Sequence, residues 1–396
     1  MAEKNEHGTV FDYLRWRGDL TFAQDPFNEV DNLILCIICY LNFRRFDDLC
    51  SKDPAGAIRI ADIYRRMTEK DEQLGLSAMS YLPLMEQAAN TKRFADVALF
   101  ASEYDYDESK EMQFEAISFL LPDQSVFVSY MGTDTTLIGW KENFNMSFLA
   151  AVPAQQRAAA YANEIARACP DRMLRIGGHS KGGNLAVWAA VHLEAAVRDR
   201  QLLAAYNNDG PGFRKGLLDT EEYHMVASRL YTFIPEASIV GMLLEHAEDY
   251  EVIESSNRAL MQHEPLSWSV EGNHFVYLGQ RSQLGQLSDD VLQGWIDSMT
   301  TQERREFTDA LFEIIGGENK IRTLDELRSG GLASQTALLR GYIGADEKKR
   351  KIINEIFRRL ATDIREELKK AAENELENAK KELKTATKLL TDRHKT

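Results

Sequence analysis

The stretch Met173-Leu174-Arg175-Ile176-Gly177-Gly178-His179-Ser180-Lys181-Gly182-Gly183-Asn184-Leu185-Ala186-Val187-Trp188 decides the fold. A short apolar segment comes first, a serine bracketed by glycines follows, and a run rich in Ala, Val and Trp comes last. This order predicts a strand, a tight turn and a helix, which is the layout of a nucleophile elbow. Glycines stand two residues to either side of Ser180 because a Cβ there would collide with the neighbouring strand or the helix start. We therefore predict that Ser180 is a nucleophile presented at a strand-to-helix turn.

Strand and helix patterns alternate around this elbow. The patterns predict strands over 114–120, 126–130, 173–176, 202–207, 229–234, 250–253 and 266–270, and helices over 154–168, from the elbow to about 197, and within 288–316. Such alternation is typical of an α/β fold with a mostly parallel central sheet and helices on both faces. Reactive groups of such sheets gather at the carboxyl ends of the strands.

Three regions differ in their sequence patterns. Residues 1–110 show helical patterns without clear strand pairs and are predicted to form a helical N-terminal cap packed on the core. Residues 111–340 are the predicted α/β-hydrolase core, and residues 341–396 are a charged helical tail. In this tail Leu376, Leu383 and Leu390 recur every seven residues. The tail is therefore expected to be a long helical extension that could pair with a second copy, giving a homo-oligomer, or lie along the acidic body.

Composition narrows the class of protein. The chain has 396 residues, 44% of them hydrophobic, and a formal net charge of −15. An acidic body disfavours nucleic acid and anionic membrane surfaces as partners. The apolar run at 33–41 is too short to cross a bilayer, and the first residues lack a signal-peptide pattern, so a cytoplasmic protein is expected. Cys36 and Cys39 have C-x-x-C spacing without a second pair, which favours buried packing over a zinc site.

A serine nucleophile needs a histidine to accept its proton and a carboxylate to orient that histidine. Of the histidines after the elbow, His192, His224 and His394 are predicted at the surface, and His246 lies in an apolar segment interpreted as a flap. His263 precedes Pro265 in a loop between two strand patterns, where a general base is often presented. We predict His263 as the base and keep His274 as the reserve.

The ends of the predicted strands indicate which residues serve as the acid and the oxyanion hole. Asp209 comes directly after the strand that follows the elbow, and it also suits the Asp-Gly-Pro-Gly turn; Glu236, after the next strand, is the alternative. The backbone N–H of Lys181 is one expected oxyanion donor. The second is expected from Thr133, in the glycine-containing loop after the strand at 126–130.

Two separated segments resemble the class 3 (fungal-type) lipases. These are Val126-Phe127-Val128-Ser129-Tyr130-Met131-Gly132-Thr133-Asp134, followed by Trp140, and Gly178-His179-Ser180-Lys181-Gly182-Gly183. The stretches Asp12-Tyr13-Leu14-Arg15-Trp16-Arg17-Gly18-Asp19-Leu20 and Asn207-Asn208-Asp209-Gly210-Pro211-Gly212-Phe213 resemble a bacterial family of lipase-like α/β hydrolases. The resemblance implies an α/β-hydrolase fold, ester hydrolysis through an acyl-serine at Ser180, an oxyanion hole at Thr133 and Lys181, and no cofactor.

The chain departs from the lipase pattern at three positions. Met131 stands where these lipases usually have arginine, and Lys181 stands where they usually have an apolar residue. Ser238 stands where the pattern places its catalytic aspartate, which is a second reason to favour Asp209 as the acid. The sequence thus predicts a serine hydrolase acting on acyl or lipid esters, with the apolar segment 239–244 as a flap or acyl-binding wall. The alternatives are a catalytically decayed scaffold protein that recruits partners through its tail, and a thioesterase or peptidase on the same fold.

Overall fold

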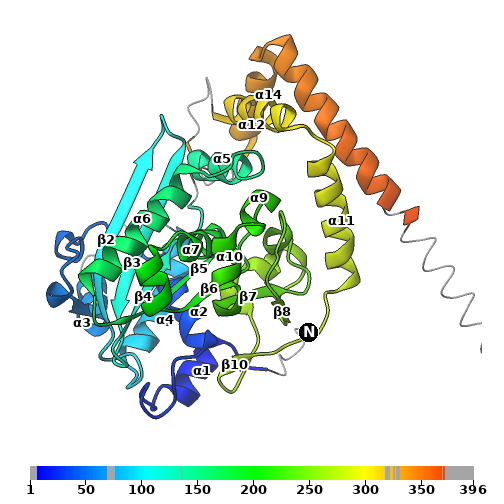
Figure 1. Ribbon diagram of the computed structural model, residues 1–396. Helices are drawn as coiled ribbons and strands as arrows, with labels where there is room; N and C mark the ends of the chain where they lie inside the picture. The colour runs from blue at the N-terminus through cyan, green and yellow to red at the C-terminus, as the bar shows by residue number, and fades with distance from the viewer. Residues whose placement is uncertain are drawn as a thin grey trace, which may run out of the picture.

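An eight-stranded sheet forms the centre of the computed structural model, which describes residues 7–68, 76–134, 136–316, 322–323, 326, 331–367 and 369–370 (Figure 1). The strands lie side by side in chain order. They are β1 (Ile58–Arg59), β2 (Ala98–Asp107), β3 (Met112–Leu120), β4 (Ser125–Tyr130), β5 (Met173–His179), β6 (Leu202–Asn208), β7 (Leu230–Pro235) and β8 (Tyr250–Ile253).

The sheet has an antiparallel part and a parallel part. Strands β1 to β4 pair in antiparallel fashion, and strands β4 to β8 pair in parallel. The predicted α/β class and mostly parallel sheet are confirmed. Because β5 lies inside the parallel part, the loops after β4, β5, β6 and β7 reach the same edge of the sheet.

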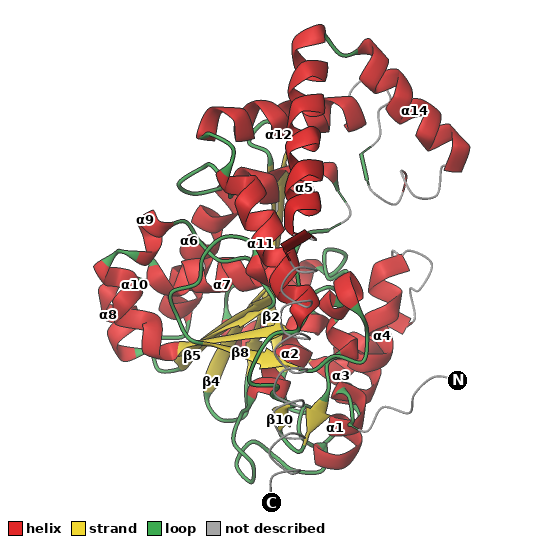
Figure 2. Cartoon of the chain, turned by 90° about the vertical axis from the view of Figure 1, so that its right-hand side faces the viewer, coloured by secondary structure: helices red, strands yellow, loops and turns green. Residues whose placement is uncertain are grey.

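Helices cover both faces of the sheet (Figures 1 and 2). One face packs against α1 (Val10–Arg17), α2 (Glu29–Ile38), α3 (Ile60–Thr68) and α4 (Leu76–Ala89); the other packs against α6 (Pro153–Ala168), α7 (Lys181–Val191), α8 (Ala195–Arg200) and α10 (Glu221–Val226). Strand β4 shows why two cores form: Phe127 joins the first apolar cluster, and Val126 and Val128 join the second. Successive side chains of a strand point to opposite faces, so a strand that is apolar throughout must be covered twice.

Helix α2 is the central element of the N-terminal face. The side chain of Asn28 caps it by accepting hydrogen bonds from the backbone N–H groups of Val30 and Asp31. Every described side chain of α2 after Glu29 is buried, so the apolar run that begins at Leu33 serves as a core element. Cys36 in this helix and Cys39, its C-cap residue, are buried free thiols, as the predicted packing role requires.

Four elements differ from the sequence-based prediction. Strands β1 and β2 both lie inside region 1–110, which was expected to be helical. The sequence did not reveal β2 because its apolar start is followed by a polar run after Ser102. The predicted strand at 266–270 is a 3-10 turn over Pro265–Ser267 followed by the two-residue β9 (Val270–Glu271), which pairs with β10 (His274–Phe275). The elbow helix ends at Val191 rather than near 197, since Glu194 begins the separate helix α8.

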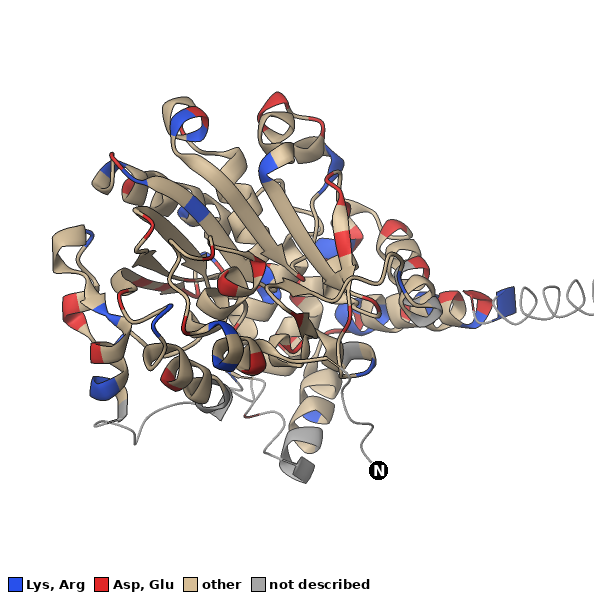
Figure 3. Cartoon of the chain, turned by 90° about the horizontal axis from the view of Figure 1, so that it is seen from below, with Lys and Arg blue, Asp and Glu red and all other residues tan. Residues whose placement is uncertain are grey.

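The remaining helices lie at the edge of the sheet that carries the elbow and beyond it. They are α5 (Leu137–Asn145), α9 (Lys215–Leu218), α11 (Gln283–Asp297), α12 (Thr301–Gly316) and α14 (Gly331–Gly344). Residues 347–367 form a further helix on which acidic and basic residues are interleaved (Figure 3). Its Ile353 and Ile356 pack with Phe307 and Ile314 of α12. Leu376, Leu383 and Leu390 lie outside the described residues, so the oligomer stays a prediction.

No helix within the described part of the chain is both long and apolar enough to span a bilayer.

Candidate active site

Ser180 stands between strand β5 and helix α7 with a strained backbone. Its φ is 60° and its ψ is −134°, a region that residues with a Cβ rarely adopt. Such a conformation costs of order 1–3 kcal/mol and persists only where the surroundings enforce it. The predicted sharp strand-to-helix turn is therefore present. Ser180 is half-buried, so solvent can reach it.

Two glycines make this turn possible. A Cβ at Gly178 would lie 2.2 Å from the backbone carbonyl of Gly182, and a Cβ at Gly182 would lie 2.1 Å from the carbonyl oxygen of Tyr130. Both contacts are with backbone atoms that cannot rotate away. The G-x-S-x-G spacing is therefore a packing requirement of this turn.

Asp209 and His263 form a hydrogen-bonded pair beside the elbow. Asp209 follows β6, is fully buried, and accepts a hydrogen bond of 2.6 Å on Oδ2 from Nδ1 of His263. The His263 side chain is 25% exposed, so its ring can still be reached. Because Nδ1 carries the proton in this bond, Nε2 of a neutral His263 is left as the proton acceptor.

The backbone next to His263 is fixed by buried polar contacts. Gln262 is almost fully buried, and its Oε1 accepts a hydrogen bond of 2.8 Å from the backbone N–H of Ala237. Its backbone carbonyl accepts a bond of 2.9 Å from the indole N–H of Trp268, a fully buried side chain. These bonds fix the 3-10 turn Ala259–His263 against β7 and the β9–β10 hairpin.

His179, the residue before the nucleophile, also holds His263. Its Nε2 donates to the backbone carbonyl of His263 at 2.8 Å, and the two rings contact each other in a tilted arrangement, with centroids 4.6 Å apart and an interplanar angle of 32°. Burial, and then the neighbouring His263 ring, hold the pKa of His179 well below its usual value of 6.5. A neutral ring that donates from Nε2 must accept at Nδ1, and there the hydroxyl of Tyr40 lies 3.0 Å away. Tyr40, which follows helix α2, thus connects the N-terminal helices with the candidate site.

The loop after β4 runs directly beside the nucleophile. A Cβ at Gly132 would lie 2.8 Å from the backbone oxygen of His179 and 3.1 Å from Cβ of Ser180, so a glycine is required for this close approach. The next residue, Thr133, accepts a hydrogen bond of 2.7 Å on its hydroxyl oxygen from Nδ2 of Asn143 in α5. This bond leaves the hydroxyl hydrogen of Thr133 free to be donated elsewhere.

Lys181, the first residue of α7, enters a buried polar network. Its ammonium group is 1% exposed and donates to the backbone carbonyl of Gln113 at 2.6 Å, to Oε1 of Gln113 at 2.7 Å, and to Oε2 of Glu142 at 3.0 Å. Glu142 is itself fully buried and accepts backbone N–H groups from Gln113 and Ala154. Helix α5 therefore anchors Lys181 through Glu142 and Thr133 through Asn143.

The hydroxyl of Ser180 makes no hydrogen bond to any described residue, whereas the Asp209–His263 bond is already formed. The reserve residues lie elsewhere. His274 donates from Nδ1 to the carbonyl of Phe275 in the β9–β10 hairpin, and Glu236 contacts Gln262 at 3.5 Å. The structure thus brings Asp209 and His263 together, and it does not bring His274 or Glu236 to that pair.

Ser238, which stands where the lipase pattern places its catalytic aspartate, has a structural role in this chain. Ser238 is buried and accepts the backbone N–H of Gly241 on its hydroxyl at 3.2 Å. Its carbonyl accepts a hydrogen bond from Arg281, a buried side chain whose pKa is lowered by burial and raised in part by the negative charge of Asp209. Arg281 therefore supplies positive charge near the buried acid.

Sequence reasoning missed Tyr40, Glu142, Asn143 and Arg281. Their neighbours are far away along the chain, so no local spacing marks them. One signal was present for Glu142: a lysine in place of an apolar residue at position 181 requires a buried acid to pair with it. Among the residues that the structure describes, no cluster of three or more His, Cys, Asp or Glu side chains could hold a metal ion.

The mostly parallel sheet, the strained serine turn and the buried acid–histidine pair make this an α/β protein with a candidate active site at the carboxyl ends of its strands. The chain belongs to the Mbeg1-like family, whose model matches residues 88–313.

Solved lipases resemble the chain only weakly. One is the Rhizomucor miehei lipase propeptide complex, with 14% identity over 49% of this chain and 64% of that chain and a TM-score of 0.32. Another is M37 lipase, with 12% identity over 53% of this chain and 68% of that chain and a TM-score of 0.31. A comparison with curated proteins gives no match.

Proposed function

We propose that the chain is a serine hydrolase that cleaves carboxylic esters through an acyl-serine intermediate at Ser180. The observation that carries this proposal is the 2.6 Å bond between the buried Asp209 and His263 beside a serine held at φ 60°. A buried acid paired with an accessible imidazole next to a strained serine is the arrangement that activates a hydroxyl for acyl transfer.

In the proposed mechanism, Oγ of Ser180 attacks the ester carbonyl carbon and its proton passes to Nε2 of His263. Asp209 stabilises the resulting imidazolium through Nδ1. The oxyanion accepts hydrogen bonds from the backbone N–H of Lys181 and from Thr133. When the tetrahedral intermediate collapses, the C–O bond to the alcohol breaks and His263 returns the proton to the leaving oxygen. Water then attacks the acyl-serine with the same base.

Among the described residues, no hydrogen bond joins Ser180 to His263, so the reaction requires this bond to form. Catalytic hydrogen bonds are often long or poorly aligned without substrate and tighten in the complex. Both residues lie at one edge of the sheet, and the His263 side chain is 25% exposed, which supports access of a substrate to its ring.

The test is turnover of p-nitrophenyl esters by the full chain and by Ser180→Ala. We expect the variant to lose about 10⁴-fold or more in kcat/KM, with an unchanged circular dichroism spectrum. Unchanged turnover in the variant would refute the proposal. Acyl chains of different length, a thioester and a peptide in the same assay distinguish an esterase from a thioesterase or peptidase.

A second candidate is a binding protein with a decayed site. It is favoured by the absence of a hydrogen bond from Ser180 to the described residues and by Ser238 at the lipase acid position. A chain of this kind would not react with a fluorophosphonate, because only an activated serine is phosphonylated.

A further inference from the structure

A cavity of about 660 Å³ lies along one flank of helix α7, away from the proposed catalytic residues. Asn184 and Trp188 line it from α7 and His192 from the C-cap of that helix, and their spacing of four residues places them on one face. Ser180, Asp209 and His263 are not part of its lining. Its volume falls within the 300–1,000 Å³ typical of small-molecule sites.

The walls of the cavity come from many parts of the chain. Besides α7, they include the α5–α6 connection, the start of α6, the segment from Gly212 into α9, the loop after β7, and helices α11 and α12. Apolar side chains form much of the lining, among them Leu149, Trp188, Leu217, Met242 and Leu243. The segment 239–244, expected from sequence to be a flap or acyl-binding wall, contributes Met242, Leu243 and Leu244 to this cavity.

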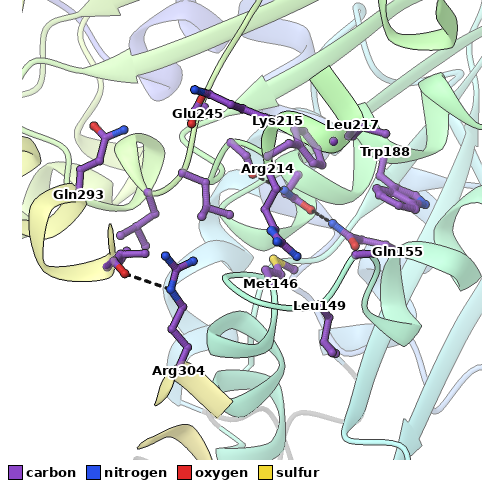
Figure 4. A pocket seen from close by; sticks show the side chains of 18 of the residues that line it. Met146, Leu149, Gln155, Trp188, Arg214, Lys215, Leu217, Glu245, Gln293 and Arg304 are labelled. Carbon is purple, nitrogen blue, oxygen red and sulfur yellow. Dashed lines mark hydrogen bonds between the residues drawn. The ribbon is translucent and has the colours of Figure 1, made fainter. Parts of the chain in front are cut away.

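Two arginines extend into the cavity from different walls (Figure 4). Arg214 donates from Nη1 to the carbonyl of Phe148 at 2.9 Å, and no carboxylate among the described residues lies within ion-pair distance of it. Arg304 donates to the carbonyls of Ser147 at 2.7 Å and Ile296 at 3.0 Å, and its Nη2 lies 3.6 Å from the carboxylate of Asp297, which is 71% exposed. A guanidinium has five N–H donors, so both groups keep donors for a ligand.

The charges around the cavity are unbalanced toward positive. Lys215 is a third basic side chain of the lining, against the carboxylates of Glu245 and Asp297. Burial lowers the pKa of Arg304; Asp297 raises it, and the nearby Arg214 lowers it again. An anion between two like charges that repel one another stabilises both of them.

We propose that this cavity binds a single-chain amphiphile with an anionic head group. The head lies between Arg214 and Arg304, and the alkyl chain packs against Trp188, Leu217 and Met242. The shared chemistry is that of a fatty-acid carboxylate and of an alkyl phosphate from a lipid head group. Ser180 does not line this cavity, so the binding proposal does not depend on the proposed hydrolase activity.

The test is isothermal titration calorimetry of the full chain carrying Ser180→Ala, with dodecanoate and dodecyl phosphate below their micelle concentrations. We expect one binding site, and dissociation constants at least tenfold higher in Arg214→Gln and in Arg304→Gln. Dodecyltrimethylammonium, which has the same chain and the opposite charge, should not bind. Tighter binding of dodecanoate would assign the site to fatty acids, and tighter binding of dodecyl phosphate would assign it to phosphate head groups.

Arg305→Gln is the matched control, because Arg305 is the next residue of α12, has the same charge, and does not line the cavity. It should bind both anions like the parent chain. Arg304 donates to two backbone carbonyls, so the Arg304→Gln variant can lose stability as well as binding. Arg214 is an exposed residue, so Arg214→Gln is the variant that decides the test. The proposal is overturned if Arg214→Gln binds as tightly as the parent, if Arg305→Gln weakens binding equally, if the cationic amphiphile binds as well, or if no heat of binding is observed.

Discussion

At the scale of single residues, Lys181 shows how the chain departs from its lipase-like pattern without losing the elbow. Its ammonium group is buried against Glu142, and the removal of one partner of such a pair leaves an uncompensated charge. We predict that Lys181→Met lowers the free energy of unfolding by about 3–5 kcal/mol, as measured by urea denaturation.

Lys141 of helix α5 provides a control. It is 16% exposed and bridges Glu111 and Asp309 at 2.7 Å each, but these carboxylates are 34% and 54% exposed, so water can solvate them when the lysine is lost. Lys141→Met should therefore cost about 1 kcal/mol. Equal losses in the two variants would show that the buried network around Lys181 has no special role in stability.

Thr133 carries the second residue-scale prediction. If its hydroxyl donates to the oxyanion while Asn143 occupies its oxygen, Thr133→Val should lower kcat for an ester by about 10²–10³-fold, with KM little changed. Steady-state kinetics of the two chains measures this. A fall in kcat of less than threefold would remove the hydroxyl from the oxyanion hole.

At the scale of elements, the elbow depends on close backbone packing between β5, β4 and α7. A Cβ at Gly178 would lie 2.2 Å from the backbone of Gly182, so we predict that Gly178→Ala destabilises the chain by about 1–3 kcal/mol or more. Gly216, in helix α9, has nothing within 4 Å of the same position, and Gly216→Ala should be neutral or stabilise by about 0.5–1 kcal/mol. Thermal unfolding followed by circular dichroism compares them, and a neutral Gly178→Ala would contradict the packing argument.

An element can be predicted from the sequence when the residues that determine it lie within the element or next to it. The strand, turn and helix around Ser180 follow from glycine spacing and apolar runs, and so do the end of β6 just before Asp209 and the α/β class. Strand β2 was missed because the polar run after Ser102 hides its apolar pattern, and the turn at 265–267 was missed because Glu264 caps it locally within a stretch that looks like a strand. Asp209 and His263 could be proposed from chain order and strand ends, whereas Tyr40 and Arg281 could not, because their partners lie far away along the chain.

At the scale of the whole molecule, buried carboxylates make stability depend on pH. Burial of Glu248 raises its pKa, but the opposing hydrogen bonds from His246, Tyr223 and Thr232 are stronger in sum and lower the pKa to about 2, from an ordinary value of 4.5. A depressed pKa contributes stability above pH 4.5 that is lost as the pH falls toward 2, here on the order of 3 kcal/mol.

Glu248→Gln tests this dependence. The difference in unfolding free energy between the parent chain and the variant should be largest above pH 4.5 and should shrink as the pH approaches 2. Urea denaturation at a series of pH values gives this difference. A difference that is constant over the whole range would contradict the assigned direction of the pKa shift.

If Asp209 and His263 activate Ser180, a fluorophosphonate should label the chain at this serine, and intact-protein and peptide mass spectrometry follow the rate of labelling. We predict a single adduct on Ser180, a rate at least 100-fold lower in His263→Ala, and no adduct in Ser180→Ala. An unlabelled parent chain, or labelling whose rate does not change in His263→Ala, would contradict the claim.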